Sequence, residues 1–481
     1  MLPLKNKSLY AVIFSLIFIF VMPIILYNGF YVDDNVRIIT GKPDWNWVGR
    51  TFADWLMKSL SLNTQVIDDF SPIPLVMAIA LFSLTLYQVI SKNVENISIM
   101  KVLPFIFLIV NPFFMQNLTY KFDSLPMTIA LSCAVFAYFY ENVSKVKKYL
   151  VMTVLLVVAL ELYQPCANVF LMLGAANLIG DFKANKEEKW KSLLLVFLTY
   201  AFASVVYMLL EKVINPDAVL SRGHIVPLNE FYPTILANIK AFFKIVFFIT
   251  GHIGLTLFVL PILGYWLYAV INTFKQKASI FDKVVVIVSP VILFFCIWGP
   301  LLVIKELISL PRELPTVGVI LFLNALVFLK LGLYLKSKVL LSVPVVLYIS
   351  CVLLCGLFIN TVKIQDSFNE MVYNSLYLNI TNNPKLYNVK EIKINGNVPV
   401  SRVFESKVKA NPYFYSLTMA TPEWITRTIL IRKGLNQVKL SFDGKDKALL
   451  KTIIKEGIKP EVNNQFYMIY KYNNITTVWF K

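Results

Sequence analysis

Residues 9–26, LYAVIFSLIFIFVMPIIL, form an almost unbroken apolar run that decides the class of fold. A helix of about 20 apolar residues spans the hydrocarbon core of a bilayer. Lys5 and Lys7 precede the run, as in a secretory signal peptide, but the run is too long for a signal peptide and no A-x-A-like cleavage site follows it. The sequence therefore predicts a first membrane helix here.

The composition of the whole chain is that of an integral membrane protein. Of its 481 residues, 57% are hydrophobic and only 15% are charged, and the mean hydropathy is +0.66. Apolar runs of this number and length exclude an ordinary soluble domain. The cysteines lie in or next to apolar runs, where sulfur acts as a small hydrophobe, so no disulfide framework is expected. They are Cys133, Cys166, Cys296, Cys351 and Cys355.

Hydropathy read along the chain predicts about eleven transmembrane helices, and the amphipathic stretch 234–250 is interpreted as non-spanning. Lysine-rich short loops alternate with loops that carry acids, and lysine-rich loops face the cytoplasm. This parity places the N-terminus in the cytoplasm and residues after 360 on the outer side. The expected helices are 9–27, 72–90, 102–118, 125–141, 149–164, 167–180, 192–211, 252–273, 284–303, 315–331 and 339–359.

Two domains are predicted from the change in composition near residue 360. Residues 1–360 form the transmembrane domain, with outward segments at 28–71 and 212–250. Residues 361–481 form a soluble α/β domain, which holds half of the chain's net charge of +18. A basic domain on the outer side suits anionic glycans or phospholipid head groups, and nucleic acid is not expected there. Its strands are expected at 389–394, 437–442 and 466–472.

The segment directly after the first helix is the candidate chemical centre. It reads Tyr-Val-Asp-Asp-Asn-Val-Arg at residues 31–37, and Trp-Asn-Trp-Val-Gly-Arg follows at 45–50. If the first segment is helical, Asp33 and Asp34 face Arg37 at i,i+4 and i,i+3. Two adjacent, partly desolvated carboxyl groups suit a general base. The alternative interpretation is that Asp33 and Asp34 only form a solvated helix end. Residues 44–62 are expected to form an amphipathic interfacial helix.

Later outward segments add further polar candidates. Glu161 lies inside an apolar run, which is costly unless it lines a wet cavity or joins an ion pair. Arg312, between two prolines, can bind phosphate through its planar fork of donors. Asp123 is as well explained by turn chemistry as by a site role. Lys240 and Lys244 share one helical face and suit phosphates, with ordinary snorkelling as the alternative.

No metal or cofactor is predicted. The chain has only two histidines, His224 and His252, and its outward loops contain no cysteine, so a zinc site is rejected. Paired acids such as Asp33 and Asp34 suit a divalent cation, but no full set of ligands is visible.

The order of these motifs carries a family resemblance. One helix, then Y-x-D-D-x-x-R, then W-x-W-x-G-R resembles the bacterial serotype-converting O-antigen glucosyltransferases of the Gtr type II family, over residues 1–360. The resemblance implies a GT-C fold in the bacterial inner membrane, with undecaprenyl-phosphate-linked glucose as donor and O-antigen of lipopolysaccharide as acceptor on the periplasmic side. The C-terminal domain resembles the variable region that accompanies acceptor choice.

The implied reaction needs a base and cations. We expect Asp33 or Asp34 to deprotonate the acceptor hydroxyl, with inversion at the anomeric carbon; which of the two does so stays open. There are two rival interpretations. One is a lipid-linked sugar transporter or flippase, and the other is a GT-C transferase of another sugar. The residues expected to bind substrate are Arg37, Arg50, Asp123, Glu161, Arg312, Lys240 and Lys244.

Overall fold

The computed structural model describes residues 6–183, 188–216, 226–276, 278–305, 309–418, 421–440 and 445–481. The chain divides into two compact units, which are described separately below. The first consists of Met1–Asn28 and Lys42–Gly356, and the second of Gly29–Gly41 and Leu357–Lys481. The expected division near residue 360 stays a prediction, but the compact units assign residues 29–41 to the same unit as the C-terminal part.

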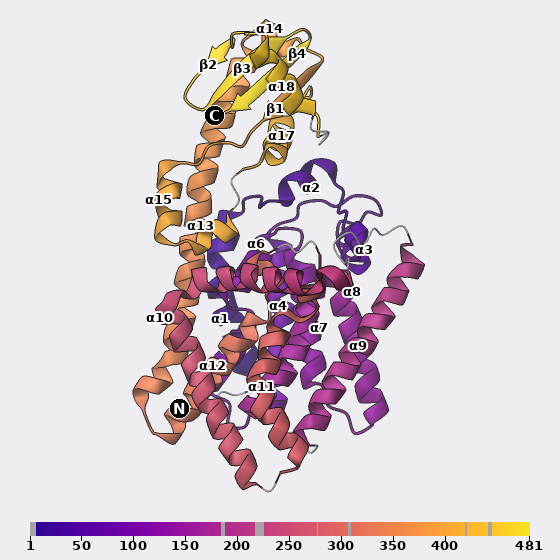
Figure 1. Ribbon diagram of the computed structural model, residues 1–481, viewed down its shortest axis with the longest axis vertical. Helices are drawn as coiled ribbons and strands as arrows, with labels where there is room; N and C mark the ends of the chain where they lie inside the picture. Colours follow the sequence, from indigo (N-terminus) through magenta and orange to yellow (C-terminus); the bar gives the residue numbers. More distant parts are fainter. Residues whose placement is uncertain are drawn as a thin grey trace. The chain divides into compact units, whose positions relative to one another are not determined.

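Helices long and apolar enough to cross a membrane dominate the described residues (Figure 1). Seven such helices are present, so the chain is a multi-pass membrane protein of mainly helical structure; the expected count of eleven is not reproduced. They are α1 (Asn6–Tyr27), α4 (Ile73–Asn93), α8 (Lys145–Gly180), α9 (Lys189–Ile214), α11 (Ile280–Trp298), α12 (Val317–Tyr334) and α13 (Lys338–Thr381).

Helix α8 is central to the first unit. It packs against the apolar helix α7 (Ser124–Phe139) and against α9, α11 and α12, while α4 covers α7. The C-terminal half of α8 is almost entirely buried. A helix that is apolar on all sides and surrounded by other helices belongs to the interior of a bundle.

The expected helix at 102–118 is instead two short helices, α5 (Ile99–Ile106) and α6 (Pro112–Thr119). Pro112 has no N–H to donate and disfavours a helical conformation at the residue before it. Asn111 is accordingly extended, and its Oδ1 caps α6 by accepting from the N–H groups of Phe113 and Phe114 at 3.1 and 2.8 Å. The break between α5 and α6 therefore follows from the Asn111–Pro112 dipeptide.

The expected helices 149–164 and 167–180 form one element, α8, with a kink at Tyr163 (φ −164°, ψ 101°). Pro165 lies two residues later, and a proline inside a helix removes a backbone hydrogen bond and clashes with the preceding turn. Carbonyl groups at the kink therefore lose their partners within the helix. They become available to other parts of the first unit.

Helix α10 (Phe231–Lys275) joins the expected segments 234–250 and 252–273. Figure 1 shows its first part lying across the direction of the long helices and its second part running along them. Asn238 fixes the first part by donating from Nδ2 to the carbonyls of Leu302 and Ile304, both at 3.0 Å. Phe242 and Ile245 bury the same face.

The expected amphipathic helix at 44–62 is interrupted. A 3-10 turn, η1 (Asn46–Val48), ends at Gly49, and α3 (Thr51–Leu60) follows. Gly49 has φ +69°, a left-handed conformation that residues with a Cβ adopt only with strain. The glycine of the W-x-W-x-G-R segment thus turns the chain sharply just before Arg50.

The second unit contains a four-stranded sheet with the strand order β1-β4-β3-β2. Strand β1 is parallel to β4, and the other neighbours are antiparallel. The strands are β1 (Glu391–Asn395), β2 (Val462–Asn463), β3 (Tyr467–Tyr472) and β4 (Ile475–Phe480). The helices of this unit, besides the end of α13, are α2 (Asp34–Thr40), α14 (Pro384–Tyr387), α15 (Arg402–Ala410), α16 (Tyr413–Leu417), α17 (Glu423–Arg432) and α18 (Lys445–Lys455).

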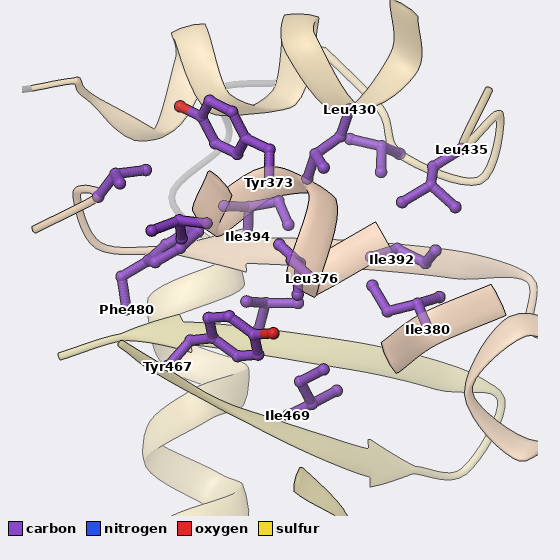
Figure 2. Packing of buried hydrophobic residues seen from close by; sticks show 14 of the residues in the cluster. Tyr373, Leu376, Ile380, Ile392, Ile394, Leu430, Leu435, Tyr467, Ile469 and Phe480 are labelled. Atoms are coloured by element: carbon purple, nitrogen blue, oxygen red, sulfur yellow. The ribbon is translucent and has the colours of Figure 1, made fainter. Parts of the chain in front are cut away.

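The core of the second unit lies between the end of α13 and this sheet (Figure 2). Leu376 and Ile380 of α13 pack with Ile394 of β1 and Ile469 of β3. The expected strand at 437–442 is not formed over 437–440, where Val438 makes only an isolated bridge to Ile392; residues 441–442 lie outside the described part.

Residues 29–41 pack within the second unit. The Tyr31 ring meets the ring of Phe358 edge-on at 6.3 Å, and its hydroxyl donates to the carbonyl of Leu417. The guanidinium of Arg432 lies 5.1 Å from the ring of Phe30. Aromatic side chains therefore fix this short segment on the C-terminal part of the chain.

Candidate active site

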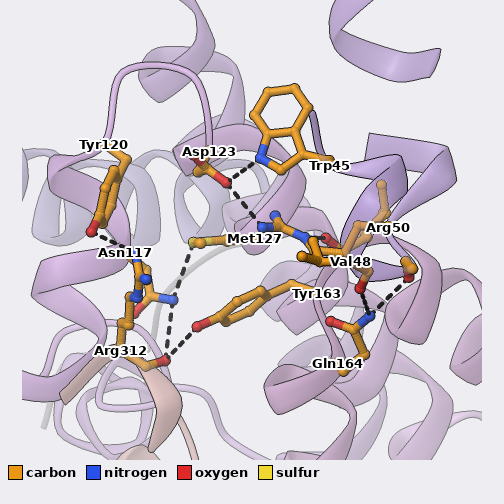
Figure 3. Close-up of polar contacts among 12 residues, drawn as sticks. Trp45, Val48, Arg50, Asn117, Tyr120, Asp123, Met127, Tyr163, Gln164 and Arg312 are labelled. Carbon is orange, nitrogen blue, oxygen red and sulfur yellow. Dashed lines mark hydrogen bonds and ion pairs between the residues drawn. The ribbon is translucent and has the colours of Figure 1, made fainter. Parts of the chain in front are cut away.

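Asp123 is the centre of a polar cluster in the first unit. It precedes α7 and is 2% exposed. Its Oδ1 accepts from the indole Nε1 of Trp45 at 2.7 Å and from Nη1 of Arg50 at 3.1 Å, and Figure 3 shows both donors pointing at it. Turn chemistry alone does not explain two charged or aromatic donors from a segment more than 70 positions earlier.

Arg50 is held on three sides. Its Nε donates to the carbonyl oxygen of Leu162 at 2.8 Å, and its Nη1 pairs with Asp123. The guanidinium carbon lies 5.0 Å from the ring centroid of Tyr163 and 5.9 Å from that of Trp45, within cation–π range. The residue is 7% exposed, and Nη2 is buried without a hydrogen-bond partner among the described residues. One donor of a fixed cation therefore remains available.

The turn before Arg50 is clamped by two helices. Gln164 of α8 donates from Nε2 to the carbonyls of Val48 and Gly49 at 3.2 and 2.8 Å. Tyr207 of α9 donates its hydroxyl to the same Gly49 carbonyl at 2.8 Å and accepts from Gln164. The position of Arg50 is thus set by side chains more than 100 positions away in the sequence.

Arg312 lies in a 3-10 turn, η4 (Pro311–Glu313), and its backbone is tightly bound. Its N–H donates to Oε1 of Gln116 at 3.0 Å, and its carbonyl accepts from the hydroxyl of Tyr163 at 3.0 Å and from Asn117 at 3.4 Å. Its Nη1 donates to the Tyr120 hydroxyl, and the guanidinium lies 5.1 Å from that ring. Helix α6 and the kink of α8 therefore place this arginine.

Tyr163 joins the two arginines. Its ring contacts the guanidinium of Arg50, and its hydroxyl binds the backbone of Arg312 (Figure 3). Tyr163 is the kinked residue of α8, so the residue at the helix break is the one that contacts both arginines. Arg50, Asp123 and Arg312, expected from sequence to share a site, are brought together.

Glu161 lies two residues before the kink and is completely buried. Neither of its carboxyl oxygens has a hydrogen bond of normal geometry among the described residues. An ionisable neighbour is Glu211 of α9, which is 3% exposed and accepts from the N–H of Thr51 at 3.3 Å. The first turn of α3 thus faces a pair of acids.

Sequence reasoning missed Glu211. It lies near the end of the apolar run of α9, as Glu161 does in α8, so the signal that singled out Glu161 applies to it as well. Lys212 follows it directly, and the pair is typical of an ordinary charged helix end.

A second ion pair braces the turn that carries Asp123. Nζ of Lys121 lies 3.1 Å from Oδ2 of Asp69. Partial burial raises the pKa of Asp69, but hydrogen bonds from Ser71 and the charge of Lys121 act in the opposite direction and hold it below its ordinary value of 3.8. The carboxylate form of Asp69 is therefore the one that the fold favours.

Asp33, Asp34 and Arg37 belong to the second unit. Asp33 is the N-cap residue of α2 and is half-buried. Asp34 is fully buried, and its Oδ2 accepts from the N–H of Tyr31 at 3.1 Å. Arg37 lies in the last turn of α2, where its carbonyl accepts from Gly41. The helical spacing expected for 33–37 is present.

Lys240 and Lys244 lie on the exposed surface of the first part of α10. In the described part of the chain, no three histidine, cysteine or acidic side chains come together as a metal-ligand set. The first unit instead places a buried arginine, Arg50, and a half-buried one, Arg312, beside tyrosine side chains, and arginine suits a phosphate anion.

A family model described as "Glucosyl transferase GtrII" matches residues 22–354. A curated relative from Salmonella phage P22, described as "Uncharacterized 55.3 kDa protein in gtrB 5'region", is 24% identical over 251 residues, which is 50% of each chain. The chain thus spans about half the length of this relative. No solved structure matches.

Proposed function

The chain belongs to the glucosyl transferase GtrII family, and on this basis we propose that it transfers a glucosyl residue from a polyprenyl-phosphate donor to a glycan acceptor. The donor is undecaprenyl-phosphate-linked glucose, and the acceptor is the O-antigen of lipopolysaccharide. Transfer takes place on the periplasmic side of the bacterial inner membrane, with the N-terminus in the cytoplasm and residues 361–481 in the periplasm.

The observation that carries this proposal is the state of Arg50. Its charge is permanent, two of its three nitrogens are fixed by Leu162 and Asp123, and Nη2 has no partner among the described residues. A preorganised cation of this kind stabilises negative charge that develops during a reaction. A departing polyprenyl phosphate carries such charge. Arg312 is the second candidate ligand for phosphate.

The reaction is a single displacement. The acceptor hydroxyl oxygen attacks the anomeric carbon of the donor, and the bond from that carbon to the phosphate oxygen breaks with its electron pair staying on the phosphate. The hydroxyl proton passes to a carboxylate. The configuration at the anomeric carbon is inverted, because the nucleophile and the leaving group occupy opposite faces.

Asp33 is the better candidate for the base within residues 29–41. It is half-buried, so part of the residue remains accessible. Asp34 is fully buried and binds the N–H of Tyr31, which suits a role in fixing the turn. A positioned carboxylate that removes a proton contributes about 10²- to 10⁴-fold to a rate.

The test is sugar transfer by the full chain in vesicles, with undecaprenyl-phosphate-linked glucose as donor and O-antigen as acceptor. Asp33→Asn and Arg50→Lys should each lower the transfer rate, Asp33→Asn by about 10²-fold or more. Asp68→Asn, a change at an exposed aspartate, should keep it. Full activity of Asp33→Asn removes the base assignment. Movement of the donor across the membrane without a glycosylated product would favour a transporter instead.

A further inference from the structure

Helix α13 changes character near residue 360. Its first part is one of the apolar stretches able to cross a membrane, and that stretch ends at Ile359. Asn360, Lys363 and Asp366 follow on the same helix, and all three are exposed. A helix that turns polar after a spanning stretch leaves the hydrocarbon at that point. The exit of α13 is therefore near residue 360.

The segment 399–417 is fastened to this exit within the second unit. Gln365 of α13 donates from Nε2 to the carbonyl of Pro399 at 3.3 Å and accepts from the N–H of Ser401 at 3.0 Å. The rings of Phe358 and Phe414 lie 6.3 Å apart. These contacts lie at both ends of the segment. They hold α15 and α16 beside the first polar turns of α13.

The outer face of this segment combines apolar and basic side chains. Val403 is 54% exposed and Tyr415 is 73% exposed, and Val400 is exposed as well. Arg402 and Lys407 of α15 are exposed, and no carboxylate in the described part of the chain pairs with them. Lys409 pairs with Glu405 at 2.9 Å. Only Phe404 anchors α15 in the protein interior.

We propose that this face, residues 399–417, docks on the anionic phospholipid head groups that surround the exit of α13. Interfacial helices place apolar side chains at the head-group boundary and basic side chains toward phosphates. Tyrosine is enriched at the same depth. The surface faces lipid because it is tied to the point where the chain leaves the bilayer. The inference is independent of which sugar the protein transfers.

The test compares amide hydrogen exchange of the full chain in nanodiscs of zwitterionic lipid with exchange in nanodiscs that contain anionic lipid. Peptides covering 399–417 should exchange more slowly in the anionic nanodiscs. The double variant Arg402→Gln/Lys407→Gln should lower the docked-to-undocked ratio about 20- to 30-fold, which corresponds to about 1 kcal/mol for each basic residue. High salt should act in the same direction.

The matched control is Lys451→Gln/Lys455→Gln, which removes two exposed lysines of α18 and should keep the lipid dependence. The proposal fails if exchange at 399–417 is the same in both lipids, or if the control variant loses protection equally. It also fails if inorganic phosphate, added to zwitterionic nanodiscs, gives the same protection, since that result indicates binding of an isolated anion.

Discussion

Arg50 Nε donates to the carbonyl oxygen of Leu162 at 2.8 Å, across 112 positions of sequence. That carbonyl is available because α8 is kinked at Tyr163, ahead of Pro165. A helix break that costs stability in the transmembrane bundle is thus used to bind a buried cation. The same kink directs Tyr163 toward Arg312. The polar cluster therefore depends on the kink of one helix.

Asp123 is expected to be essential for the stability of this cluster. Asp123→Asn removes the counter-charge of Arg50 and leaves a buried guanidinium unpaired, which costs about 3 to 5 kcal/mol. The unfolding midpoint in detergent should fall clearly. Asp68→Asn, at an exposed position, should leave it within experimental error. Equal midpoints for both variants would contradict the assigned role of the ion pair.

Tyr163 has two separable contacts, and two variants distinguish them. Tyr163→Phe keeps the ring against Arg50 but loses the hydrogen bond to the Arg312 carbonyl, for an expected cost of about 1 kcal/mol. Tyr163→Leu also loses the cation–π contact and should cost more. Chemical or thermal unfolding of the two variants measures the difference. If both variants lose the same stability, the ring contact with Arg50 contributes nothing.

Replacing one carboxyl group of the Glu161–Glu211 pair with an amide should stabilise the folded protein. Glu161→Gln provides an N–H₂ donor beside orphaned carboxyl oxygens, so we expect a gain of about 1 kcal/mol in the free energy of unfolding. Glu211→Gln should give a similar gain, and the double variant should add little. A lower unfolding midpoint in both single variants would show that the pair has another stabilising partner.

The ion pair of Asp69 and Lys121 predicts a loss of stability in acid. The pKa of Asp69 is lower in the folded chain than its ordinary value of 3.8, so the folded state favours the carboxylate. This contribution is complete above about pH 5 and is lost as the pH falls through the folded-state pKa. Asp69→Asn should therefore reduce the difference in unfolding midpoint between about pH 5 and about pH 3. An unchanged pH dependence would show that the Asp69 carboxyl group does not contribute to the loss of stability in acid.

The candidate site residues differ in how far sequence could place them. Arg50, Asp123 and Arg312 were singled out by charge and by position in outward segments, and they do meet in one cluster. Asp33 and Asp34 were singled out on the same grounds, yet they pack with the C-terminal part. Local charge patterns identify which residues are polar and exposed to one side of a membrane. They carry no information on which distant segment a short loop will pack against.

The side chains that hold the turn before Arg50 are the other contacts that sequence does not predict. Gln164, Tyr207 and Glu211 fix the turn at Gly49 and the start of α3, and each is a polar residue within a mainly apolar helix. Such a residue is recognisable as unusual, since burial of a polar group needs a partner. The partner itself becomes visible only when α8 and α9 are packed side by side.

Sequence by itself determined that this is a multi-pass membrane protein, because runs of about 20 apolar residues have no stable place in water. The breaks near Pro112 and Pro165 have a local cause in backbone geometry, although hydropathy predicts one continuous helix over 102–118. Tertiary structure alone decided which carbonyls, acids and rings surround Arg50. Those contacts join positions more than 70 residues apart, and only the packing of α3, α7, α8 and α9 brings them within hydrogen-bonding distance.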